Sequence, residues 1–242
     1  MNGSIRAVCF DVDGTLIDTV QLILQSLRHA YRFGLGREFS DEELRPLIGM
    51  PLDPQMRYFD HLSSAPLNHE SMAQEEMAYF EANKHLERIV PEAVEALKAA
   101  KHSGRKTALV TSKNRAELAT ALPRLGVAEQ LDAIVGCDDV PRPKPAPDSM
   151  QEAMRRLNAD PKETILIGDT LYDLRCGREA GARVAAVGWG AGTREELTAF
   201  EPEFFFEAPA QLLNWIKELP PIEPNAKKKE DRARAVAASD AR

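Results

Sequence analysis

A short stretch near the N-terminus restricts what this chain can become more than any other part of it. Ile5–Leu16 reads Ile-Arg-Ala-Val-Cys-Phe-Asp-Val-Asp-Gly-Thr-Leu, and its apolar, partly β-branched first half predicts a buried strand. Asp11 and Asp13 follow one residue apart, and Gly14 then lets the backbone turn. Residues i and i+2 of an extended chain point to the same side, so both carboxylates project together. Such a pair repels itself unless a cation or a proton intervenes, which indicates a functional site rather than a simple acidic turn.

The segment that follows is predicted to be helical, with no convincing strand from Asp18 to about Glu87. Apolar residues recur at helical spacing, and Ser40 with Glu43 forms a capping box. One helix is expected over residues 20–33 and a second from 40 through 47. A third is expected to run through Met56 and Tyr58, and a long fourth helix to cover 68–86. We interpret this stretch as a helical insert, and as a small domain of its own.

From Pro91 onward, apolar strands alternate with amphipathic helices. This alternation predicts an α/β fold, in which a parallel sheet is covered by helices on both faces. We predict a core formed by residues 1–17 and 88–219, a separate helical domain over 18–87, and a disordered tail over 220–242. Strands are expected at 106–112, 131–136, 164–168, 183–187 and 204–206, and helices at 91–100, 115–125, 146–157, 172–180 and 209–219, with a capping box at Thr193 and Glu196.

Polar side chains gather where the predicted strands end. Asp11 and Asp13 follow the first strand, Thr111 and Ser112 close the second, and Asp169 follows the strand at 164–168. Ligands of open parallel sheets bind beyond the carboxyl ends of the strands. The sequence therefore predicts one active site at that edge.

These residues suit a phosphate ester held beside a metal ion. Asp11, Asp169 and Asp173 could share a hard cation, and carboxylates with water suit Mg²⁺. The two strand-end hydroxyls and Lys144, which lies between prolines, are good phosphate ligands. A carboxylate facing a neutralised phosphate can attack phosphorus and form an acyl phosphate.

Composition excludes several other classes of function. The net charge of −7 over 242 residues argues against nucleic acid as a partner, because phosphate backbones require a basic face. No apolar run approaches the roughly 20 residues of a membrane span, and no signal peptide is visible. Cys9, Cys137 and Cys176 are widely spaced, which suggests neither a disulfide framework nor a metal site and fits a reducing, cytoplasmic setting. A monomer or a homodimer is compatible with the sequence.

Four motifs in order, Asp11–Thr15, Thr111–Ser112, Lys144 and Gly168–Asp173, resemble those of the haloacid dehalogenase-like hydrolase superfamily. The first, with its Asp-Val-Asp-Gly-Thr-Leu-Ile-Asp sequence, is the most specific. The resemblance implies a Rossmann-like core, and it likens the helical insert to the mobile α-helical cap of that family.

The resemblance also implies roles for the opening acids. Asp11 matches the nucleophile that becomes an aspartyl-phosphate. Asp13 matches the general acid/base, whose backbone carbonyl would also reach Mg²⁺. Dehalogenases of the family lack this second carboxylate, so its presence favours cleavage of a phosphate ester or anhydride.

The remaining motif residues match the phosphate and metal sites of the family. Thr111 matches the hydroxyl that holds the transferring phosphoryl group, with help from the Ser112 backbone. Lys144 matches the lysine that offsets charge on the nucleophile and the phosphate. Asp169 matches a direct metal ligand, and Asp173 matches a supporting acid.

The substrate is expected to be a small phosphorylated metabolite, because a closing cap excludes large ones. The motifs Thr111–Arg115, Asp138–Pro141 and Glu201–Phe204 resemble those of phosphoglycolate phosphatases, and at least equally those of bacterial pyrophosphatases of this superfamily, for which Lys113 also argues. We therefore expect a Mg²⁺-dependent phosphatase of the phosphoglycolate type. The alternatives are an inorganic pyrophosphatase and a phosphomutase of the β-phosphoglucomutase kind.

Substrate contacts on the insert are harder to assign from sequence. Arg45, the Ile48–Gly49 loop and Arg57 are candidates. Each is interpreted more readily as a surface group than as a substrate ligand, because charged side chains and loops are usually solvated.

Overall fold

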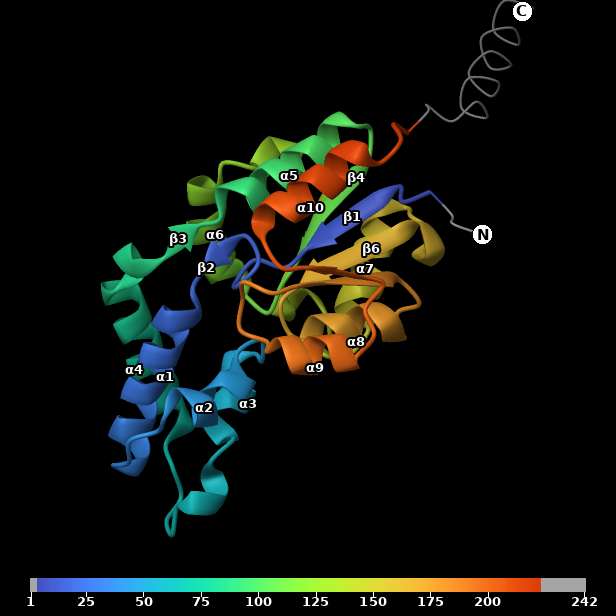
Figure 1. The fold of residues 1–242 in the computed structure, drawn as a ribbon. Helices are drawn as coiled ribbons and strands as arrows, with labels where there is room; N and C mark the ends of the chain where they lie inside the picture. The colour runs from blue at the N-terminus through green and yellow to red at the C-terminus, as the bar shows by residue number, and fades with distance from the viewer. Residues whose placement is uncertain (1–3, 223–242) are drawn as a thin grey trace, which may run out of the picture.

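A six-stranded parallel sheet organises the chain, in the strand order β5-β4-β1-β6-β7-β8 (Figure 1). The structure is a computed structural model and describes residues 4–222. The predicted α/β fold class is confirmed, and each predicted core strand is present. The strands are β1 Ala7–Phe10, β4 Lys106–Val110, β5 Ala133–Val135, β6 Thr164–Gly168, β7 Arg183–Val187 and β8 Phe204–Phe206.

The sequence of β1 explains its central place in the sheet. All four of its residues are buried, as a strand covered on both faces requires. Val8 and Phe10 join one hydrophobic cluster, and Ala7 and Cys9 join the cluster on the opposite face. Because β1 pairs with β4 on one side and β6 on the other, whatever follows its last residue emerges at the middle of the carboxyl edge.

Helices cover both faces of the sheet (Figure 1). One face is covered by α5 and α10, which pack on each other, and the other by α7 and α8. Within residues 4–222, no helix combines the length and apolar character needed to span a bilayer. The helices outside the insert are α5 Pro91–His102, α6 Arg115–Leu125, α7 Asp148–Leu157, α8 Leu171–Glu179, α9 Arg194–Ala199 and α10 Pro209–Glu218.

The helical insert forms a second body beside the sheet (Figure 1). It has its own hydrophobic cluster, in which the rings of Tyr31, Phe39 and Phe59 pack together. The predicted capping box of Ser40 and Glu43 is present. The division into a core domain and a cap domain stays a prediction. The helices of the insert are α1 Val20–Leu35, α2 Asp41–Leu44, α3 Leu52–Arg57 and α4 His69–Ala82, with short 3₁₀ turns at Arg45–Leu47, Asp60–Leu62 and Lys84–Leu86.

Two expectations for the insert are wrong in detail. A two-stranded antiparallel ribbon, β2 Ile17–Asp18 with β3 Arg88–Ile89, joins the insert to the sheet, so the segment from Asp18 onward is not free of strand. The long helix ends at Ala82 instead of Leu86, because the backbone leaves helical geometry at Asn83 and a 3₁₀ turn follows.

The chain beyond α10 stays attached to the core for a few residues longer than predicted. Arg105 donates a hydrogen bond to the Pro220 carbonyl at 2.6 Å, and the backbone N–H of Ile222 donates to the carbonyl of Ser103 at 3.1 Å. Residues 220–222, which were predicted as part of the tail, are therefore bound to the core. The disorder predicted for the remainder, 223–242, lies outside the described residues.

Candidate active site

The predicted motifs converge at the carboxyl edge of the sheet, where Lys144 links them. Its ammonium nitrogen lies 2.9 Å from Asp11 Oδ1 and 2.6 Å from Asp173 Oδ1. It also donates a hydrogen bond to the carbonyl of Val110 at 3.1 Å, just before Thr111. Only 2% of Lys144 is exposed, so these ion pairs are shielded from water. Residues far apart in the sequence thus form one buried charge cluster.

Three carboxylates of this cluster could hold a metal ion. Oxygens of Asp11, Asp169 and Asp173 lie within 4.8 Å of one another. Asp169 is fixed by the hydroxyl of Thr15, which donates at 3.1 Å, and by the backbone N–H of Ala191, which donates at 2.8 Å. The side chain of Asp173 also caps the start of α8.

The charges of the cluster do not balance without a further cation or a bound proton. Burial raises the pKa of Asp11 against the opposing effect of Lys144, and burial together with Asp173 and Asp11 raises the pKa of Asp169. Burial alone would lower the pKa of Lys144, but Asp11 and Asp173 raise it above its ordinary value. One ammonium thus faces three buried carboxylates. A hard divalent cation such as Mg²⁺ fits this oxygen-rich set.

Two glycines make room for Asp169. Gly14 has a φ of +72°, and a Cβ there would lie 2.1 Å from Asp169 Oδ2. A Cβ on Gly190 would lie 2.2 Å from the same oxygen. The turn predicted from Gly14 is therefore needed both for the backbone and for the close approach of Asp169.

Asp13 lies beside the cluster and borders an open cavity. Lys113 places its ammonium nitrogen 2.9 Å from Asp13 Oδ2 and 5.3 Å from the centre of the Phe80 ring. The other carboxylate oxygen, Oδ1, is buried and accepts no hydrogen bond from any described residue. Asp13 therefore keeps one oxygen without a hydrogen-bond donor among the described residues, next to the cavity.

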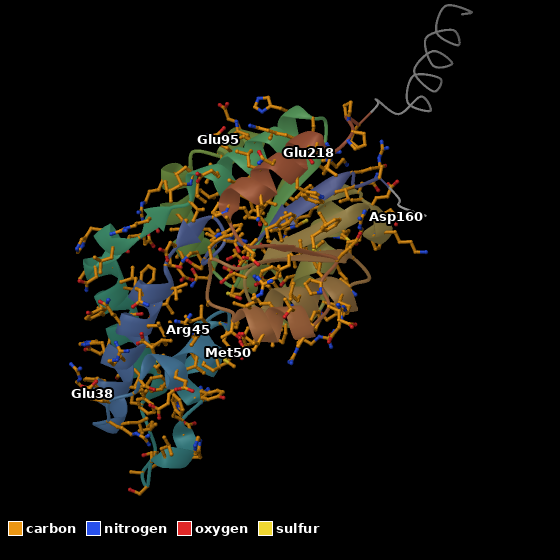
Figure 2. All side chains as sticks on the ribbon, in the orientation of Figure 1. Glu38, Arg45, Met50, Glu95, Asp160 and Glu218 are labelled. Atoms are coloured by element: carbon orange, nitrogen blue, oxygen red, sulfur yellow. The ribbon has the colours of Figure 1, made fainter. Side chains whose placement is uncertain are left out.

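The cavity lies between this edge of the sheet and the helical insert, with a volume of about 220 Å³. Asp11, Asp13 and Thr111 form its floor, whereas Lys144, Asp169 and Asp173 are buried and do not line it. Figure 2 shows Met50, another lining residue, on the part of the insert nearest the sheet. The walls formed by the insert are largely apolar and include Ile23, Met50, Leu52, Met77 and Phe80.

A loop of the insert, residues 45–49, is hydrogen-bonded to the sheet edge. Ser112 donates to the carbonyl of Gly49 at 2.6 Å, and Tyr172 donates to that of Pro46 at 3.0 Å. Arg45 donates to the carbonyl of Ala191 at 3.1 Å. The hydroxyl of Ser112 thus holds the insert against the site, while its backbone remains beside Thr111.

Of the substrate contacts suggested for the insert, the structure places some in the cavity and others outside it. Ile48 and Gly49 line the cavity. Arg45 does not, because its guanidinium is turned toward Ala191, and Arg57 pairs with Asp53 at the surface of the insert.

Sequence reasoning missed one buried acid of the insert. Glu76 on α4 lines the cavity and is only 8% exposed. Burial raises its pKa to about 7, with Glu117 adding to the rise and Ser26 and Lys113 opposing it. The sequence pattern that could have predicted this position is the spacing of four residues from Glu76 to both Met72 and Phe80, which puts Glu76 on the apolar face of the helix.

This acid should make the stability of the protein depend on pH. The folded protein holds the proton of Glu76 up to about pH 7, whereas the unfolded chain releases it near 4.5, so stability falls as the pH rises between these values. We expect Glu76→Gln to raise the free energy of unfolding at pH 8 by up to about 3 kcal/mol and to change it little at pH 4. Urea denaturation at both pH values tests this. Glu70→Gln, exposed on the same helix, is the control, and equal effects of both variants would contradict the assignment.

Comparison with known proteins assigns the chain to a protein family. The sequence model described as haloacid dehalogenase-like hydrolase matches residues 8–187, well over half of the chain. The chain belongs to that family. This hydrolase is 34% identical to pyrophosphatase PpaX of Bacillus velezensis, over 87% of this chain and 95% of PpaX.

Solved structures agree with this placement. The hydrolase superposes on CbbY of Rhodobacter sphaeroides, determined in complex with phosphate, with a TM-score of 0.74 and 26% identity over 86% of this chain and 96% of CbbY. It shares its fold with a hydrolase of Pseudomonas syringae, with a TM-score of 0.79 and 24% identity over 89% of this chain and 99% of that one.

Proposed function

We propose that this hydrolase is a Mg²⁺-dependent phosphatase that cleaves small phosphomonoesters through an aspartyl-phosphate on Asp11. One observation carries the proposal. Lys144 is ion-paired with a buried Asp11 on the cavity floor, while Asp13 beside it keeps a carboxylate oxygen free of hydrogen bonds from the described residues. That arrangement supplies a nucleophile and a separate proton carrier at one end of the cavity.

The proposed reaction has two steps. The carboxylate of Asp11 attacks phosphorus, the bond from phosphorus to the ester oxygen breaks, and Asp13 gives its proton to the departing alcohol. Asp13 then takes a proton from water as the water oxygen attacks the phosphorus of the aspartyl-phosphate. Inorganic phosphate leaves, and Asp11 is regenerated. The hydroxyl of Thr111 orients the phosphoryl group, and the ammonium of Lys144, paired with Asp11, offsets negative charge, since phosphoryl transfer depends mainly on positioning and charge.

We assign the metal site to Asp11, Asp169 and the backbone carbonyl of Asp13, with Asp173 in support. A bound Mg²⁺ supplies the positive charge that lets a carboxylate and a phosphate approach each other. The helical insert acts as the cap in this proposal, and the hydrogen bonds of loop 45–49 hold it over the site.

Removing the metal is expected to stop catalysis. Charge stabilisation of several kcal/mol would be lost, so phosphate release should fall at least about 100-fold after treatment with a chelator. Adding Mg²⁺ should restore it, and Ca²⁺ should not, because its larger and looser coordination suits the site less well. Phosphate release measured before and after chelation tests this. Full activity in the presence of the chelator would contradict the metal assignment.

A pyrophosphatase is the second candidate, because PpaX is a close relative over nearly its whole length and Lys113 places a cation in the cavity. The apolar walls of the insert favour an organic alcohol over a second phosphate group. A panel that includes phosphoglycolate, other phosphomonoesters and pyrophosphate, assayed for phosphate release with Mg²⁺, separates the two. Turnover of pyrophosphate alone would reject the monoester proposal.

A further inference from the structure

One buried acid has no part in the proposed chemistry. Glu76 lines the cavity on the side formed by the insert, and among the described residues no lysine, arginine or histidine forms an ion pair with it. A carboxyl group buried without a cationic partner is costly to keep. Its neighbours along α4, Met77 and Phe80, contribute apolar surface to the same cavity.

The contacts of Ser26 indicate which form of Glu76 is present. The hydroxyl oxygen of Ser26 lies 3.0 Å from the carbonyl oxygen of Ile23 and 2.5 Å from Glu76 Oε1. A hydroxyl has one proton to donate, so a protonated Glu76 that donates to Ser26 lets both contacts be full hydrogen bonds. The raised pKa of Glu76 agrees with a protonated carboxyl group at this position.

The second oxygen of Glu76 is then an acceptor without a donor. In residues 4–222, nothing donates a hydrogen bond to Oε2, and this oxygen is not among the polar atoms sealed from solvent. It therefore presents a carbonyl-like acceptor to the cavity. Met77 and Phe80 on the same helix offer it no donor, and the nearby ammonium of Lys113 is paired with Asp13.

We propose that Glu76 determines specificity by accepting a hydrogen bond from a hydroxyl group on the alcohol half of the phosphomonoester. The inference rests on the proposed function and narrows it to esters of polyols or sugars. A carboxylate or a second phosphate at this position would meet an acceptor instead of a donor. Phosphoglycolate and pyrophosphate should therefore be poorer substrates than a hydroxylated ester of similar size.

The test compares three phosphate esters that differ in the group they would present to Glu76. Glycerol 1-phosphate and propyl phosphate have the same carbon skeleton with and without hydroxyls, and phosphoglycolate carries a carboxylate. For the wild type, kcat/KM should be highest with glycerol 1-phosphate. In Glu76→Met, the ratio of kcat/KM for glycerol 1-phosphate over propyl phosphate should fall about tenfold, as the loss of one hydrogen bond predicts. Glu76→Gln should keep much of that ratio, because its amide has an acceptor for the substrate and a donor for Ser26.

Glu75→Met is the matched control, since Glu75 is the adjacent carboxylate on α4 and pairs with His29 outside the cavity. It should leave the ratio as in the wild type. An unchanged ratio in Glu76→Met, or equal losses on both esters, would overturn the inference. A wild type that does not prefer glycerol 1-phosphate over propyl phosphate would overturn it without any variant. A wild type that hydrolyses none of the esters would instead reject the proposed function itself.

Discussion

Replacing Asp11 with asparagine is expected to reduce phosphate release at least about 1,000-fold while leaving the fold intact. The amide nitrogen cannot attack phosphorus, and the amide oxygen is a far weaker nucleophile than a carboxylate. The side chain keeps its shape, and the loss of one negative charge relieves repulsion within the acid cluster. The measurement is kcat on the best ester of the panel, with circular dichroism to check the fold.

Asp160→Asn is the matched control for this variant. Asp160 precedes β6, so it lies at the opposite edge of the sheet, remote from the labelled Met50 of the cavity (Figure 2). Its replacement should change kcat by less than about twofold, as expected for a residue outside the site. An Asp11→Asn protein with wild-type turnover would mean that another group attacks the substrate.

Replacing Lys144 with methionine is expected to damage both stability and catalysis. The variant keeps the aliphatic length but leaves Asp11 and Asp173 without their shared ammonium in a buried site. Removing one partner of a buried ion pair costs about 3–5 kcal/mol, and we expect a loss of that size in the free energy of unfolding without metal. Turnover should fall at least about 100-fold, because charge on the phosphoryl group is no longer offset.

Urea denaturation with and without Mg²⁺ measures this effect. Added Mg²⁺ should restore part of the stability, since it supplies a cation to the same carboxylates. Lys98→Met is the control, because Lys98 pairs with Glu95 at the surface and such pairs contribute less than about 1 kcal/mol. Equal stability of the Lys144 and Lys98 variants would contradict the role of Lys144 at the centre of the cluster.

The sheet was predictable because its strands are buried on both faces. Thr164–Gly168, for example, is buried throughout and apolar over Ile165–Ile167, and it is followed by the charged residue Asp169. The ribbon of β2 and β3 was not predictable, since two paired residues leave no periodic signal. The end of α4 was misplaced for a similar reason, because Lys84–Leu86 continues with residues that also suit a helix.

The residues of the site were predictable because parallel strands bring their carboxyl ends to one edge. That rule places Asp11, Thr111 and Asp169 together without knowledge of any side chain. It does not say where a side chain on a neighbouring helix points. Arg57 and Glu76 are both ionisable residues on helices of the insert, yet one lies at the surface and the other lines the cavity.

Packing between the insert and the sheet decides such differences. Residue type suggested the hydroxyl of Ser112 as a phosphate ligand, but in the structure it donates to the carbonyl of Gly49. No local pattern in the sequence specifies that contact, because it depends on how the insert is positioned over the edge.

Chemical trapping of the intermediate tests the central claim most directly. An aspartyl-phosphate is an acyl phosphate, which borohydride reduces to an alcohol, whereas a free carboxylate does not react. The account predicts that brief incubation with substrate and Mg²⁺, followed by borohydride, converts Asp11 into homoserine, as read by mass spectrometry of the peptide that contains residues 7–28. Protein without substrate should retain Asp11. Homoserine at another position, or an unmodified Asp11 during continuing phosphate release, would contradict the account.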